Sequence, residues 1–181
     1  DIVITWAGDK HRDIAGLNVK QIARRWGRSA LDTYLQLVDD TQGQGRVLMH
    51  KYLTPEILGR LMADDKCLYM TDAWIEDEGM QNPAAFSCFP EFLRLGRETG
   101  TLPHVVRQMT GAAADRFGLT GRGYLRPGFH ADVTVFDPRT AAPGPDPAGR
   151  PVGIRHVFVN GEQAVRDGAA LGVRAGRVLL L

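Results

Sequence analysis

The sequence predicts an α/β segment over residues 1–117 and an all-β segment over residues 118–181. Three observations support this division. A strand, a helix and a second strand follow one another within about twenty-five residues, which is the pattern of a βαβ unit. Apolar residues recur at helical spacing through most of the chain up to Gly118. Beyond that glycine, turn signals separate short runs rich in β-branched residues, which is typical of strands.

Length and charge exclude several classes of protein. The 181 residues amount to about one domain, or one domain with an appendage, and a complete (β/α)8 barrel is excluded because it takes about 250 residues. The formal net charge is +1, so neither nucleic acid nor an anionic membrane is expected as a partner. Because the chain opens at Asp1 with no methionine and no signal peptide, we interpret it as a processed or truncated piece of a longer protein.

The first predicted elements are a strand over residues 2–5 and two helices. Asn18 is expected to begin the first helix, because its side chain can accept from the backbone of the first turn, and Gly27 to end it. Ser29 is expected to begin the second helix in the same way. Another strand is expected over residues 47–49.

The βαβ unit centres on a helix that begins near Thr54. Thr54 is the expected cap, and Pro55 occupies the first helical position, where a backbone N–H has no partner within the helix. Residues 67–71 are short and mostly apolar, as in a strand buried on both faces of a parallel sheet. Asp72 therefore stands at the carboxyl end of a predicted strand, where barrels and doubly wound folds place their chemistry.

The remaining predicted elements are two helices, a strand and a hairpin. They are a helix over residues 86–99, a helix from Pro103 that Gly118 ends, a strand over residues 131–136, and hairpin strands over residues 154–159 and 162–165. Asn160 and Gly161 between the last two strands predict a type I′ turn. Residues 137–153 hold five of the ten prolines and are expected to form a loop.

Asp72 is the leading candidate for chemistry. It opens the densest polar cluster of the chain, over residues 72–79. A carboxylate at a strand end can act as a metal ligand, a general base or a general acid when its surroundings bring its pKa toward neutrality. The alternative is a helix or turn cap followed by a solvated acidic loop, and spacing alone does not decide between the two.

Spacing shows no complete metal site. The five histidines include no pair at the i, i+2 or i, i+4 spacing of metal ligands. His50 follows the predicted strand over residues 47–49, so it either faces the same edge as Asp72 or points into solvent. Cys67 and Cys88 fit neither a disulfide scaffold nor a zinc ribbon, and we expect two buried thiols in a reducing cytoplasm.

Several segments together resemble one known family. Residues 123–137 resemble the C-terminal signature of the amidohydrolase superfamily, a G-x-L-x-x-G-x-x-A-D run that leads into a hairpin such as residues 154–161. Residues 17–23 resemble a segment of its D-aminoacylase branch, the N-acyl-D-amino-acid deacylases. The run Met70-Thr71-Asp72 is similar to the G-S-D that ends the eighth barrel strand in that branch. The resemblance covers nearly the whole chain.

This resemblance implies a fold and a reaction. Residues 1–117 would be the C-terminal part of a (β/α)8 (TIM) barrel, and residues 118–181 the C-terminal half of a small β-sandwich domain. The complete protein would be a hydrolase that cleaves a non-peptide C–N bond with a water activated by one or two zinc ions. Asp72 alone carries over as catalytic: it would take a proton from that water, pass it to the leaving nitrogen, and lie beside or bind the metal.

The resemblance also implies that this chain depends on residues outside it. The remaining metal ligands would precede Asp1, on an upstream part of the same protein or on a partner chain. We therefore expect the chain alone to bind zinc weakly and to hydrolyse nothing. The substrate would be a small amide, the location cytoplasmic, and oligomers are possible. The alternative is a non-catalytic fragment or split-gene module that is inactive without an upstream metal-binding chain.

Two departures from the branch bear on the substrate. Asn82-Pro83-Ala84 stands where D-aminoacylases carry H-P-R, which leaves Asn82 as a candidate substrate contact. Glu91 stands where arginine is common. An arginine that binds a substrate carboxylate with two hydrogen bonds cannot be replaced by alanine without loss of that contact. The substrate is therefore either an N-acyl-D-amino acid or a different acyl amine, cyclic amide or lactam.

Overall fold

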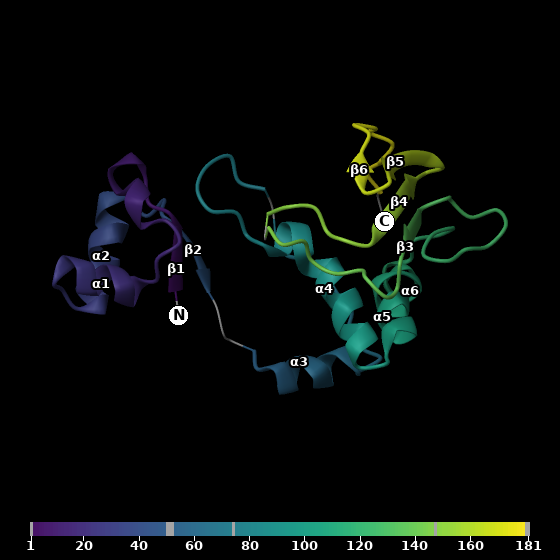
Figure 1. The fold of residues 1–181 in the computed structure, drawn as a ribbon, viewed down its shortest axis with the longest axis horizontal. Helices are drawn as coiled ribbons and strands as arrows, with labels where there is room; N and C mark the ends of the chain where they lie inside the picture. Colours follow the sequence, from purple (N-terminus) through teal and green to yellow (C-terminus); the bar gives the residue numbers. More distant parts are fainter. Residues whose placement is uncertain (1, 50–52, 74, 147, 180–181) are drawn as a thin grey trace. The chain divides into compact units, whose positions relative to one another are not determined.

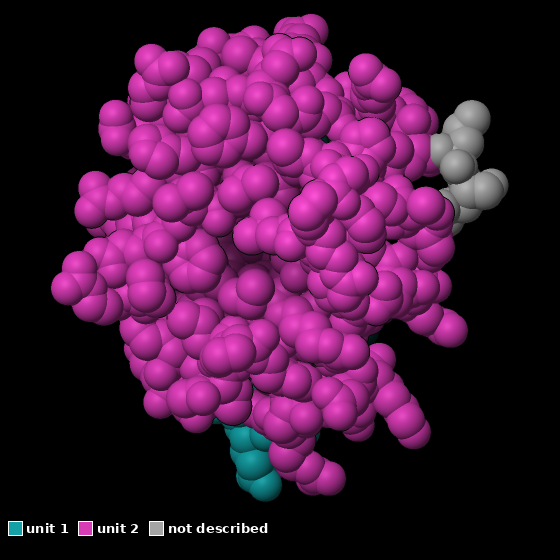
Figure 2. All heavy atoms as spheres, turned by 90° about the vertical axis from the view of Figure 1, so that its right-hand side faces the viewer, with its two compact units in different colours: residues 1–58, 73–82 teal, residues 59–72, 83–181 magenta. Residues whose placement is uncertain are grey.

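A computed structural model of the chain describes residues 2–49, 53–73, 75–146 and 148–179. The chain divides into two compact units (Figure 2). The first unit comprises Asp1–Leu58 with Ala73–Asn82, and the second comprises Gly59–Asp72 with Pro83–Leu181. The boundary predicted between residues 117 and 118 stays a prediction. His50 lies outside the described residues.

The first unit packs helices against a pair of antiparallel strands (Figure 1). Its elements are β1 (Ile2–Trp6), the 3-10 helix η1 (Asp9–Ile14), α1 (Val19–Trp26), α2 (Ala30–Asp40) and β2 (Arg46–Met49). The core consists of apolar side chains from β1, the residue that follows it, η1, α1 and α2: Ile4, Ala7, Ile14, Val19, Ile22 and Leu37. The unit therefore has a hydrophobic core of its own.

Capping residues set the helix ends as the sequence predicts. The Asn18 side chain accepts from the Gln21 backbone at 2.9 Å, and the Gln21 side chain accepts from the Asn18 backbone at 2.8 Å. Gly27 ends α1 in the left-handed region with a φ of 64°, which glycine adopts without a Cβ clash. Ser29 accepts from the Asp32 backbone at 3.0 Å and begins α2. These predictions are confirmed.

The predicted βαβ unit is wrong. Helix α3 (Pro55–Met62) forms as expected, with the Thr54 hydroxyl accepting from the Ile57 backbone at 3.3 Å. However, β2 pairs antiparallel with β1, with Ile4 opposite Val47, and residues 67–71 are not a strand. A strand requires a partner for its backbone groups, and residues 67–71 have no ladder partner in the described part of the chain.

The described residues of the second unit include the end of α3, three further helices and a four-stranded antiparallel sheet. Its elements are α4 (Ala84–Glu98), α5 (Leu102–Met109), α6 (Gly111–Phe117), β3 (Val133–Phe136), β4 (Ile154–Val159), β5 (Glu162–Arg166) and β6 (Ala169–Ala170). The strands pair in chain order, β3-β4-β5-β6. No helix in the described ranges is long and apolar enough to cross a membrane.

The single helix expected from Pro103 to Gly118 is divided in two at Thr110. This residue leaves helical geometry, with φ −129° and ψ −93°. Its neighbour Gly111 lies directly under the Tyr124 ring, where a Cβ would come within 2.5 Å of a ring carbon. The break in the helix therefore lies beside this tight contact, and the helical period of the apolar residues did not predict it.

The hairpin of β4 and β5 confirms the predicted turn. Asn160 and Gly161 have φ values of 49° and 86°, as a type I′ turn requires. The Asp132 carboxylate accepts from the Asn160 backbone at 2.8 Å and pairs with Arg122, whose guanidinium also donates to the Asn160 side chain at 2.7 Å. The family-like signature around Asp132 thus serves to hold this turn.

Candidate functional site

Asp72 ends a segment, residues 67–72, that packs on helix α4 through side chains. The Tyr69 ring stacks on Phe92 at 4.5 Å between ring centres. The Cys88 thiol donates to the Met70 carbonyl at 3.3 Å, and the Thr71 hydroxyl donates to the Ala84 carbonyl at 2.8 Å. Burial raises the pKa of the Cys88 thiol, which keeps it protonated as a donor. Side-chain contacts thus hold this segment against α4.

Helix α5 holds the turn that precedes this segment. Gln108 is fully buried, and its side-chain amide donates to the Asp64 carbonyl at 3.3 Å. The Met62 carbonyl accepts from the Tyr69 hydroxyl at 2.8 Å and lies 3.0 Å from His104 Nε2. Residues 62–72 are therefore fixed at both ends by helices of the second unit.

Asp72 itself is exposed and has an unusual backbone. Its φ is 41°, in the left-handed region that residues other than glycine seldom adopt, although Asp and Asn tolerate it best. Such conformations persist where the surroundings hold them, and they gather at functional sites. The described residues thus present an accessible carboxylate on an anchored backbone.

The acidic cluster over residues 72–79 does not form one site. Glu76 pairs with Arg46, and the Glu78 carboxylate accepts from the Trp6 indole at 3.1 Å, both within the first unit. Arg46 also lies over the Trp6 ring, 5.2 Å from its centre. Among the acidic residues of this cluster, Asp72 alone belongs to the second unit.

Asn82 belongs to the first unit, where it lines a cavity of about 130 Å³. The other lining residues are Thr5, Arg46, Val47, Leu48, Glu76 and Met80. Because Asp72 and Asn82 belong to different units, their sharing of one substrate site stays a prediction.

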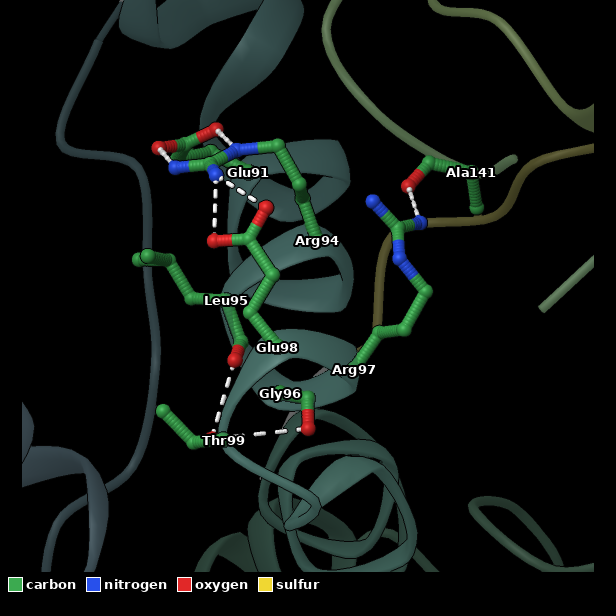
Figure 3. Close-up of polar contacts among 8 residues, drawn as sticks. All are labelled: Glu91, Arg94, Leu95, Gly96, Arg97, Glu98, Thr99 and Ala141. Atoms are coloured by element: carbon green, nitrogen blue, oxygen red, sulfur yellow. Dashed lines mark hydrogen bonds and ion pairs between the residues drawn. The ribbon is translucent and has the colours of Figure 1, made fainter. Parts of the chain in front are cut away.

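Two of the positions that depart from the family pattern, Ala84 and Glu91, lie on α4. Ala84 opens this helix and provides the carbonyl that receives the Thr71 hydroxyl. Glu91 pairs with Arg94 through two hydrogen bonds of 2.5 and 2.7 Å, and Arg94 also binds Glu98 at 2.6 Å (Figure 3). The i, i+3 and i, i+4 spacings of these charges were a readable signal of this network.

The side chains that the structure describes do not build a metal centre by themselves. No three His, Cys, Asp or Glu residues among them gather closely enough to hold an ion. A zinc site takes three or four protein ligands, so Asp72 could supply one donor of a set completed by other residues.

Comparison with known proteins identifies relatives over nearly the whole chain. No family model matches it. The D-aminoacylase of Alcaligenes xylosoxydans xylosoxydans is 33% identical over 98% of this chain and 36% of that protein. The N-acyl-D-glutamate deacylase of the same organism is 32% identical over 99% of this chain and 36% of that protein. The chain spans about a third of the length of these curated relatives.

Solved structures show the same likeness. A D-aminoacylase structure, from work on the role of its binuclear metal centre, has a TM-score of 0.85 and 30% identity over 98% of this chain and 37% of its own. A Bordetella bronchiseptica N-acyl-D-glutamate deacylase with zinc and a phosphonate inhibitor has a TM-score of 0.79 and 30% identity over 94% and 36%. The mixed α/β fold therefore matches the C-terminal part of such structures.

Proposed function

Because the chain belongs to the D-aminoacylase and N-acyl-D-amino-acid deacylase family of amidohydrolases, we propose that the protein containing it is a metal-dependent amidohydrolase. The reaction is hydrolysis of the amide bond of an N-acyl-D-amino acid or a related small amide. The observation that carries this proposal is the match to D-aminoacylase over 98% of the chain in both sequence and structure. The family resemblance further suggests that residues 1–117 complete a barrel and residues 118–181 a β-sandwich.

Asp72 is the proposed catalytic residue of this chain. A zinc ion held by Asp72 and by ligands from outside this chain would lower the pKa of a water to near 7. The Asp72 carboxylate accepts the proton that the attacking water loses and delivers it to the nitrogen as the C–N bond breaks. The exposed side chain and the anchored backbone support this role, because proton transfer needs an acceptor at hydrogen-bond distance in a fixed direction.

The chain alone is proposed to be inactive. One carboxylate does not make a zinc site of three or four ligands, and the relatives contain about twice as much further sequence. The other ligands then come from an upstream part of the protein or from a partner chain. The 181 residues then contribute the proton acceptor and the segment that holds it in place.

A deacylase assay tests the proposal. The full-length protein is stripped of metal with a chelator and then titrated with Zn²⁺. The substrates are N-acetyl-D-methionine, N-acetyl-D-glutamate, N-acetyl-D-aspartate and a cyclic amide, each beside its L-isomer where one exists. We expect zinc-dependent amine release from at least one D-substrate or cyclic amide, and none from the 181-residue chain alone. Absence of zinc-dependent hydrolysis by the full-length protein would contradict the proposal.

A further inference from the structure

Residues 76–81 form a loop that one side chain closes. The Gln81 side-chain oxygen accepts from the Glu76 backbone at 2.9 Å, and the Gln81 side-chain nitrogen donates to the Glu76 carbonyl at 2.9 Å. The 76–81 loop lies between Asp72 and Asn82 in the chain, and Asn82 follows its last residue directly. The position of the loop therefore sets the position of Asn82, the candidate substrate contact.

The loop contacts the end of β1. The Met80 backbone donates to the Thr5 carbonyl at 2.9 Å. Gly79, with a φ of 82°, passes so close to β1 that a Cβ would collide with the same carbonyl oxygen. The Trp6 indole donates to the Glu78 carboxylate at 3.1 Å. These residues all belong to the first unit, so the surface that carries the loop is made by this chain itself.

Arg46, at the start of β2, joins the loop to β1. It stands opposite Trp6 in the antiparallel pair, and its guanidinium lies over the Trp6 ring, 5.2 Å from the ring centre. One guanidinium nitrogen pairs with the Glu76 carboxylate, and another donates to the Glu78 carbonyl at 2.8 Å. The side chains of Arg46 and Glu76 are 28% and 20% exposed, so salt screens this ion pair less than a surface pair. A planar guanidinium can bind two acceptors and a ring at once, which a lysine ammonium cannot do in the same geometry.

We propose that Arg46 is a positioning residue that holds the 76–81 loop on β1 and thereby places Asn82 for contact with the substrate. The proposal rests on the proposed function. Arg46, Glu76 and Asn82 line the same cavity, so the ion pair lies beside the candidate substrate contact. A loop that is in place for only a fraction of the time lowers the apparent affinity for substrate by that fraction, so the effect belongs in KM. We expect little change in kcat, because the contacts of the segment that ends at Asp72 lie in the second unit.

The first test measures KM and kcat of the full-length protein with added Zn²⁺, on the substrate that it hydrolyses in the deacylase assay. Arg46→Met keeps a long side chain over the Trp6 ring and removes the charge and both donors. Arg25→Met is the matched control, because Arg25 pairs with Asp13 at 2.8 Å in the same unit and outside the loop. We expect KM to rise about 10-fold in Arg46→Met with kcat changed less than about three-fold, and both constants to stay within about two-fold of wild type in Arg25→Met. An unchanged KM in Arg46→Met would overturn the proposal.

A double variant tests whether Arg46 acts through Asn82. Asn82→Ala should itself raise KM about 10-fold, because it removes the substrate contact. If Arg46 serves to place Asn82, the double variant Arg46→Met with Asn82→Ala should have a KM within about two-fold of that of Asn82→Ala alone. Increases in KM that multiply in the double variant, or an unchanged KM in Asn82→Ala, would contradict this route.

A further readout does not depend on turnover. Hydrogen exchange of the Glu76 and Met80 amides should accelerate at least about ten-fold in Arg46→Met and stay unchanged in Arg25→Met, because both amides are hydrogen-bonded only while the loop is in place. The Ile4 amide, in the core of the first unit, should not respond in either variant. Unchanged exchange of the loop amides in Arg46→Met would overturn the proposal.

Failure of the proposed function is distinguishable from failure of this inference. If the wild-type protein hydrolyses nothing, the proposed function fails and the substrate role of Arg46 fails with it, while hydrogen exchange still decides whether Arg46 holds the loop. If Arg46→Met does not fold, Glu76→Gln, which removes the charge at the other end of the ion pair, replaces it. Unfolding of both variants would overturn a local positioning role.

Discussion

Residues 46–49 and 67–71 have the same apolar character, yet they reach different structures. The first run pairs with β1, with Val3 opposite Leu48 and Ile4 opposite Val47. The second run meets no strand in the described part of the chain; its Met70 carbonyl accepts from the Cys88 thiol, and its Thr71 hydroxyl donates to the Ala84 carbonyl. An apolar run therefore predicts that a segment will be at least partly buried. Whether it becomes part of a sheet depends on the presence of a partner strand.

The largest effect is expected in the paired region. Ile4 is 3% exposed and lies in the core of the first unit, so Ile4→Ala should lower the free energy of unfolding of that unit by about 2–4 kcal/mol. Val47, its partner in register, is 41% exposed, and Val47→Ala should cost less than about 1 kcal/mol. Hydrogen exchange of the α1 and β1 amides measures both. Equal losses of unfolding free energy in Ile4→Ala and Val47→Ala would show that pairing rather than burial stabilises β1.

A smaller effect is expected in the unpaired segment. Tyr69→Phe keeps the stacking on Phe92 and removes the hydrogen bond to the Met62 carbonyl, which should cost about 1 kcal/mol and speed exchange of the amides of residues 67–72. Amides of β2 should not respond. Tyr34→Phe, at an exposed tyrosine of α2, is the control and should change neither region. Unchanged exchange in Tyr69→Phe would mean that this hydrogen bond does not hold the segment.

The smallest effect is a difference in acid sensitivity. Hydrogen bonds from Lys10 and His11 lower the pKa of the Asp40 carboxyl to about 2. Because the ordinary value is about 3.9, the ionised carboxylate stabilises the first unit fully above about pH 4, and this contribution is lost as the pH falls toward 2. Asp40→Asn should therefore lower the melting temperature by a few degrees at pH 7 and by progressively less below pH 4. Asp39→Asn, at the exposed neighbour, should show no such trend.

Local chemistry explains which elements were predictable. Asn18, Ser29 and the Asn160-Gly161 turn act within a few residues of themselves, so their patterns predicted the helix starts and the hairpin correctly. The break at Thr110 was missed because helical periodicity carries no information about the close contact beside it, between Gly111 and the Tyr124 ring farther along the chain. The pairing of residues 46–49 with β1 was missed because periodicity carries no information about partners.

The candidate site was predictable only in part, for the same reason. Asp72 was found from its place after an apolar run, and its family-like motif added a role. The contacts of Thr71 with Ala84 and of Met70 with Cys88 join residues 13 and 18 positions apart, and the sequence spacing does not predict them. Asp72 as catalytic residue and Asn82 as substrate contact therefore remain proposals.

Asp72→Asn in the full-length protein, assayed with added Zn²⁺, tests the central claim most directly. Asparagine tolerates the left-handed backbone and keeps the side-chain shape, so the fold should persist while the proton acceptor is lost. We expect kcat to fall about 100- to 10,000-fold with an unchanged circular dichroism spectrum, whereas Asp77→Asn, at an exposed carboxylate, should stay within about two-fold of wild type. An Asp72→Asn enzyme that is folded and retains more than about a tenth of wild-type kcat would contradict the claim that Asp72 transfers the proton.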